Sequence, residues 1–82
     1  MTPDKTNEER VIEAVARVFH RKVTEINRGT RFIQDLFAKS VNIVELIAIL
    51  GYEFGINISL AHARRAKTVG EATDLVVSLL KK

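Results

Sequence analysis

The sequence predicts an all-α fold: a small antiparallel bundle of three main helices plus one short helix. Apolar residues recur at the spacing of a helix in three stretches, and the first and last stretch each begin with a Thr-x-x-Glu capping box. No stretch alternates as a strand would. The later connections are short, which favours antiparallel neighbours. We therefore expect residues 1–82 to form a single domain.

The first helix is expected to start at Thr6 and to end near His20. In its capping box the Thr6 hydroxyl accepts from the Glu9 amide, while the Glu9 carboxylate accepts from the Thr6 amide. One apolar stripe follows at helical spacing. It contains Val11, Ile12, Val15, Val18 and Phe19.

Residues 21–39 have no sustained period, and we expect them to form a long loop. Apolar residues recur along it, so the loop is expected to lie on the core, and Gly29 is expected to supply its turn. These apolar residues are Val23, Ile26, Phe32, Ile33, Leu36 and Phe37.

A second helix is expected over residues 41–54. Gly55 is expected to stop it in a left-handed conformation, with Ile56 as the accompanying hydrophobic contact. Apolar side chains fall on about one third of its circumference and form the predicted core face. They are Ile43, Leu46, Ile47, Leu50 and Phe54.

The same helix carries a second apolar stripe. Val41, Val44 and Ala48 lie away from the core face, beside Glu45. An amphipathic helix does not need this stripe for folding. Either the long loop covers it, or it is exposed and docks a partner.

Two further helices follow after a short extended piece. Ser59 is expected to cap a brief helix over residues 60–66. A second capping box at residues 68–71 starts the last helix, which continues to the Lys81-Lys82 end. Lysine there suits the negative pole of the helix.

Composition excludes several classes of function. A chain of 82 residues holds one modest core and lacks room for the buried cleft of a usual multi-group enzyme. It has no cysteine, so any thiol must come from an attached group. His20 and His62 lack ligand-like spacing, so no metal site is expected. Without an apolar run that spans a membrane or a signal core, we expect a cytoplasmic protein.

Ser40 stands immediately before the second helix, on the side of the Val41 stripe. Serine is among the best helix N-caps, and capping alone would explain its presence. The same position suits an attachment site, because a helix N-terminus stabilises a phosphodiester through its dipole and free amides. Both roles remain open from geometry alone.

Three ordered segments of the chain resemble the acyl carrier protein family of fatty acid and polyketide synthesis. They are FIQDLFAKSVNIVEL at residues 32–46, YEFGINI at 52–58 and KTVGEA at 67–72. The resemblance implies that a phosphopantetheinyl transferase attaches 4′-phosphopantetheine, from coenzyme A, to Ser40. The thiol of that arm would then hold acyl chains as thioesters. The protein would be a non-catalytic carrier used by acyl-transferring, condensing or acyl-modifying enzymes.

The resemblance also implies an acyl-holding interior and a partner-binding surface. The interior would be lined by Phe32, Leu46, Ile47, Leu50, Ile58, Ala63 and Val76. The candidate residues for partner recognition are Asp35, Lys39, Val41, Val44, Glu45 and Ala48.

Charge near Ser40 departs from the family pattern. Lys39 stands where the family usually has Asp, and Val41 where it usually has Leu. The third-helix region includes Arg64, Arg65 and Lys67, where the family is typically acidic. Because electrostatic complementarity decides partner choice, we expect a specialised member with dedicated enzymes.

Two other functions are compatible with the sequence. A carrier fold that has lost its cofactor would serve only as a docking protein, with Ser40 as a cap. The net charge of +3 would also suit a helical module that binds an anionic partner such as nucleic acid. The chain has one tyrosine and no tryptophan, and no helix presents clustered Arg or Asn, so we expect no nucleic acid. We expect a monomer.

Overall fold

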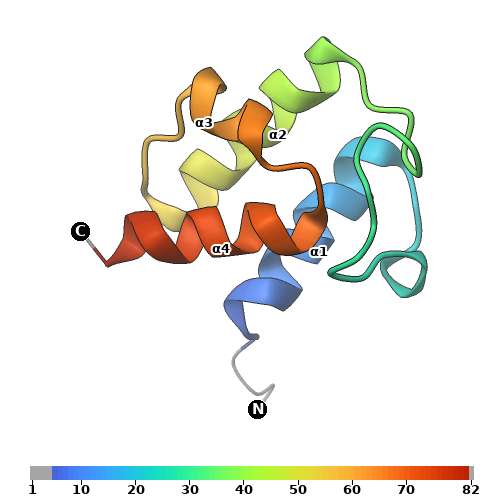
Figure 1. Cartoon of the computed structure of the whole chain (residues 1–82). Coiled ribbons are helices and arrows are strands. Elements are labelled where there is room, and N and C mark those ends of the chain that lie inside the picture. The colour runs from blue at the N-terminus through green and yellow to red at the C-terminus, as the bar shows by residue number, and fades with distance from the viewer. Residues whose placement is uncertain (1–4, 82) are drawn as a thin grey trace.

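This computed structural model describes residues 5–81 of the chain. They contain four α-helices and one short 3₁₀ helix, joined by loops (Figure 1). The predicted all-α fold, with three long helices and one short one, is confirmed. No helix among the described residues is both long and apolar enough to cross a bilayer. The elements are α1 (Asn7–Phe19), η1 (Val23–Glu25), α2 (Ser40–Phe54), α3 (Leu60–Arg65) and α4 (Val69–Leu80).

The two predicted capping boxes start α1 and α4. Thr6 Oγ1 accepts from the Glu9 amide at 3.1 Å, and Glu9 Oε1 accepts from the Thr6 amide at 3.0 Å. Thr68 and Glu71 make the same reciprocal pair at 3.1 and 3.2 Å. At the other end of α1, His20 closes the helix in a left-handed conformation. Lys82 lies outside the described residues.

The core forms where α1 packs against α2 and α4, with α3 against α2 (Figure 1). On the predicted core face of α2, Ile43 and Ile47 are half-buried and the other three side chains are buried. The buried apolar residues of the core are Val11, Ala14, Val15, Ala16, Val18, Ile26, Phe32, Leu36, Leu46, Leu50, Phe54, Val69, Ala72 and Val76.

The long loop lies on the core with one side only. Backbone hydrogen bonds from Asp35 to Arg31 and from Phe37 to Ile33 wind it like a helix. Residues four apart then share a side. The buried pair Phe32 and Leu36 faces the core, and the exposed pair Ile33 and Phe37 faces solvent, with Phe37 72% exposed. The loop therefore lies on the core as expected, but Ile33 and Phe37 do not contribute to that contact.

At the beginning of the loop, Val23 does not contribute to the contact with the core, whereas Gly29 lies in a turn as predicted. Val23 is half exposed and opens the short 3₁₀ helix η1, in which no residue is buried. Gly29 does lie in a turn, where its amide donates to Asn27 Oδ1 at 2.7 Å. It does so without a positive φ, which Gly55 alone adopts among the described glycines.

Backbone hydrogen bonds tie this loop to the start of α4. The Phe32 amide donates to the Lys67 carbonyl at 3.1 Å, and the Val69 amide donates to the Thr30 carbonyl at 2.9 Å. The Gly70 amide donates to the Arg28 carbonyl at 2.9 Å. A Cβ on Gly70 would lie 3.0 Å from that carbonyl oxygen, so glycine permits the close approach.

Arg28 adds side-chain links at the same junction. Its guanidinium pairs with Glu8 at 2.8 Å and with Asp74 at 3.1 Å, and so connects the loop to α1 and α4. All three side chains are largely exposed, so each pair contributes little by itself. The backbone hydrogen bonds determine the position of the loop, and Arg28 supports it.

The ends of α2 and α3 also follow their sequence signals. Gly55 ends α2 with φ 64°, and the amides of Gly55 and Ile56 both donate to the Gly51 carbonyl. Ile56 packs against the core as expected. Ser59 Oγ accepts from the His62 amide at 3.1 Å and caps α3.

Gly55 provides a direct test of the end of α2. Gly55→Ala should lower the free energy of unfolding by about 1 kcal/mol, because a Cβ is unfavourable in the left-handed region. Gly55→Asn should lower it less, because asparagine tolerates this conformation. Urea denaturation of the parent and both variants measures the difference. Equal losses for alanine and asparagine would contradict the proposed cause.

Candidate functional site

Ser40 is the first residue of α2, and Lys39 occupies the N-cap position. Ser40 therefore does not act as the N-cap, which is one of the two roles that the sequence leaves open for it. The capping hydrogen bond comes from Asn42, whose Oδ1 accepts from the Lys39 amide at 2.9 Å. The Ser40 side chain is exposed, and its hydroxyl makes no hydrogen bond to any residue within 5–81. The helix start thus leaves this hydroxyl available for chemistry.

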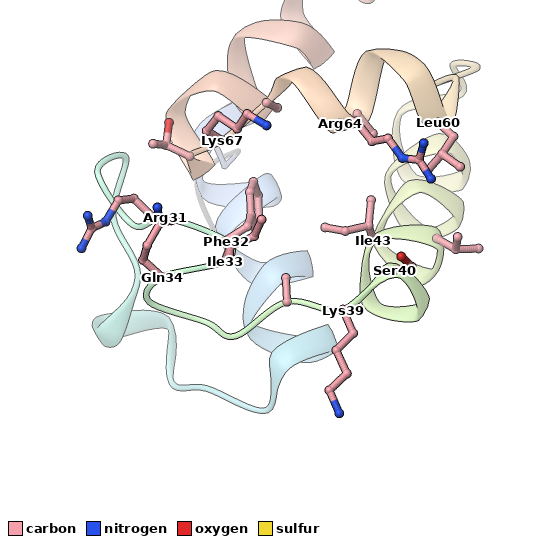
Figure 2. Close-up of a pocket in the computed structure, with 15 residues that line it drawn as sticks. Arg31, Phe32, Ile33, Gln34, Lys39, Ser40, Ile43, Leu60, Arg64 and Lys67 are labelled. Carbon is pink, nitrogen blue, oxygen red and sulfur yellow. The ribbon is translucent and has the colours of Figure 1, made fainter.

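An open pocket of about 660 Å³ lies beside Ser40 (Figure 2). Its walls come from α2, α3, the end of the long loop and the residues just before α4. Ile43 of α2, Ala63 of α3 and Phe32 of the loop supply part of the apolar lining. The volume falls within the range typical of sites for small organic ligands. A flexible group attached to Ser40 can therefore fold back into this pocket.

A second, much smaller cavity of about 30 Å³ lies between the helices. It shares Phe32, Ile43, Ala63 and Ala66 with the open pocket. Six of the seven residues expected to line an apolar interior do line it, but Val76 does not. Val76 is fully buried within the packed core instead. The interior holds space for about one water molecule, so a longer chain must displace side chains to enter it.

The second stripe of α2 is exposed, which decides between the two explanations for it. Val41 is 69% exposed and Val44 54%, and Ala48 is also exposed. The long loop does not cover these residues. Tyr52, one turn beyond Ala48, is 90% exposed. This surface fits a docking site in its apolar character, and docking itself stays a prediction.

The charged candidates for partner recognition do not all gather at Ser40. Lys39 and Glu45 are exposed and form no ion pair with other described residues. Asp35 instead pairs with Arg31 at 3.1 Å and also accepts from the Arg31 amide at 2.8 Å. These hydrogen bonds hold the pKa of Asp35 below its ordinary value. Asp35 lines a different hollow from that of Ser40, and its partner Arg31 belongs to the same loop.

The pocket also contains residues that sequence reasoning did not place there. Leu60, Arg64 and Lys67 line it, from α3 and the segment that follows. No signal in the sequence places Leu60 there, because its position beside α2 depends on how α3 packs. The sequence alone shows the basic charge of the third-helix region. The place of this charge beside the Ser40 pocket depends on tertiary packing.

Comparisons with known proteins identify the family. A family model described as "Phosphopantetheine attachment site" matches residues 9–76. The chain belongs to this family. It is 37% identical over 75 residues to the acyl carrier protein of Rickettsia canadensis, covering 92% of this chain and 86% of that protein. It is 40% identical, with the same coverage, to the acyl carrier protein of Rickettsia typhi.

A solved structure agrees with this family assignment. The acyl carrier protein of Enterococcus faecalis superposes with a TM-score of 0.74 and 29% sequence identity, covering 89% of this chain and 92% of that one. The protein is an acyl carrier that works through a covalently attached 4′-phosphopantetheine, and it is a non-catalytic partner of acyl-metabolising enzymes. An exposed, free hydroxyl beside an open pocket fits this cofactor.

The Arg31–Asp35 contact predicts a pH dependence of folding stability. The pKa of Asp35 is lower in the folded than in the unfolded protein, so its stabilisation is present above about pH 4, its unfolded pKa. It is lost as the pH falls through the lower, folded pKa. Asp35→Asn should thus be less stable than the parent near neutral pH, and the difference should vanish in acid.

Urea denaturation of the parent and Asp35→Asn between pH 2 and 7 measures this difference. Arg31→Gln serves as a second variant, because it removes the partner guanidinium and should also weaken the pH-dependent contribution of Asp35. A parent-to-Asp35→Asn difference that stays constant across the pH range would contradict the coupling.

Proposed function

We propose that Ser40 carries the 4′-phosphopantetheine arm and that the chain serves fatty acid, polyketide or a specialised acyl pathway. The observation that supports attachment at Ser40 is the position of its free hydroxyl. This hydroxyl lies at the start of α2 and lines the pocket. The chain has two other serines. Ser59 uses its hydroxyl to cap α3, and Ser78 lies in the last turn of α4, away from this pocket.

The attachment chemistry suits this position. The Ser40 oxygen forms a bond to the phosphorus of coenzyme A that bears the pantetheine chain. The bond from that phosphorus to the adenylate half breaks, and the hydroxyl proton is released. The product is a phosphodiester at the N-terminus of a helix of 15 residues, where the dipole stabilises negative charge. A phosphopantetheinyl transferase would perform this step.

The pocket next to Ser40 also supports a route for the cargo. It shares its lining with the small cavity between the helices, so the two spaces are neighbours. An acyl chain on the arm would enter between α2 and α3, past Ile43 and Ala63, and displace side chains further in. The acyl cargo would then be shielded from water until a partner enzyme binds.

The role of Ser40 can be tested with purified protein. Incubation with coenzyme A and a phosphopantetheinyl transferase should increase the intact mass by one phosphopantetheine group. Ser40→Ala should show no increase, because the attacking oxygen is absent. Ser59→Ala and Ser78→Ala are the matched controls and should be modified at the parent rate. Modification of Ser40→Ala, or its loss in Ser78→Ala, would contradict the assignment.

The exposed stripe of α2 supports a docking surface around Ser40. We propose that partner enzymes contact Val41, Val44 and Ala48 together with the exposed charges of Lys39 and Glu45. Asp35 would contribute indirectly, because its contact with Arg31 shapes the loop that leads to Ser40. The partners would be dedicated enzymes, since Lys39 gives the surface an unusual charge.

The charge of Lys39 provides a test of partner choice. A phosphopantetheinyl transferase that serves acidic carriers would meet them with basic residues. It should modify this protein slowly, because repulsion between those residues and Lys39 lowers the encounter rate. Lys39→Asp should increase the modification rate severalfold, most strongly at low salt. Lys22→Asp, which makes the same change at a residue that does not line the Ser40 pocket, is the control. Equal rates for the parent, Lys39→Asp and an acidic carrier would contradict this proposal.

The expected monomeric state and cytoplasmic location stay predictions. Sedimentation and cell fractionation test them directly.

A further inference from the structure

The charged residues that line the pocket beside Ser40 are all basic, and no acidic side chain is part of its lining. Walls of one charge sign concentrate the electrostatic field inside a cleft and attract the opposite charge. An acyl chain without charge does not need such walls. The four basic residues are Arg31, Lys39, Arg64 and Lys67.

Two of these cations are directed elsewhere. The Arg31 guanidinium pairs with Asp35 at 3.1 Å and extends away from the opening (Figure 2). Lys39 also points away from it. These side chains therefore contribute to the general field and do not offer direct contacts inside the pocket.

Arg64 and Lys67 lie on the opposite side of the opening from Lys39, along α3 and the segment after it (Figure 2). Neither side chain forms an ion pair with another residue in the described part of the chain. The nearest acidic residue in sequence, Glu71, accepts from the backbone amides of Lys67 and Thr68 and is not part of the lining. Both charges therefore remain available to an anion in the pocket.

We infer that Arg64 and Lys67 form an anion-binding pair for the group that Ser40 carries. This inference rests on the proposed attachment at Ser40. The ligand is an anionic oxygen, and it has two possible sources on a loaded carrier. One is the phosphodiester of the arm, and the other is a carboxylate at the far end of the cargo. Arginine and lysine both donate charge-assisted hydrogen bonds to either group.

The inference has a consequence for cargo. A chain that ends in a carboxylate gains a contact that an uncharged chain of equal length lacks. The segment after α3, which contains Lys67, has a fixed position. The Lys67 carbonyl accepts from the Phe32 amide and so holds this segment against the loop. Lys67 therefore projects from a backbone held against the loop, and Arg64 projects from α3, which packs against α2.

The test uses the full chain loaded with two cargoes of equal length. A transferase attaches the arm from hexanoyl-coenzyme A or from adipoyl-coenzyme A, and intact mass verifies loading on Ser40. ³¹P NMR then reports on the phosphodiester. ¹³C NMR of a labelled terminal carboxylate measures the acid dissociation constant of the adipoyl group. Each measurement is repeated with Arg64→Gln/Lys67→Gln.

A matched control removes two cations outside the pocket, in Arg65→Gln/Lys22→Gln. If the carboxylate is the ligand, its acid dissociation constant should be about two- to fivefold larger in the parent than in Arg64→Gln/Lys67→Gln. The control should stay close to the parent. If the phosphodiester is the ligand, the ³¹P resonance should move in Arg64→Gln/Lys67→Gln with both cargoes and stay unchanged in the control.

Equal ³¹P shifts and equal dissociation constants in the parent, the pocket variant and the control would overturn the inference. The mass measurement would still show an arm on Ser40, so the proposed function would stand. Failure of the arm to attach to Ser40 would overturn both.

Discussion

The amides of Phe32, Val69 and Gly70 hold the long loop against the start of α4, through carbonyls on the opposite segment. Val69 and Gly70 are the first residues of α4, and Phe32 lies in a loop with little regular structure. The amides of all three residues would therefore otherwise need water or another partner. Ser40 lies at the end of this loop, and Lys67 lies on the segment to which the loop is bonded. The junction therefore determines where Ser40, the pocket and its basic rim lie relative to one another.

Local signals in the sequence were sufficient for most helix boundaries. The capping boxes at Thr6 and Thr68, the Ser59 cap and the left-handed Gly55 each act within a few residues. The start of α2 was less accessible, because Asn42, two residues inside the helix, provides the capping oxygen. By residue type, Ser40 before the apolar run is a better predicted N-cap than Lys39.

Long-range features could not be read from periodicity. The loop winds so that Phe32 and Leu36 are buried while Ile33 and Phe37 are exposed, and this choice depends on hydrogen bonds within and beyond the loop. The exposure of Val41 likewise depends on where the loop lies. Arg64 lines the Ser40 pocket because α3 packs against α2, and Lys67 lines it because its segment is hydrogen-bonded to the loop. The family resemblance predicts the cofactor, and the structure shows the environment of Ser40.

These surroundings suit a carrier that keeps its reactive group accessible while its core stays closed. The hydroxyl of Ser40 is free, the neighbouring pocket is open, and the interior cavity is small until something enters it. The most direct test of this account is the intact mass and peptide map of the protein isolated from its own host. The account predicts a phosphopantetheine group, with or without an acyl chain, on the peptide that contains Ser40. An unmodified Ser40 in cells with active acyl metabolism would contradict it.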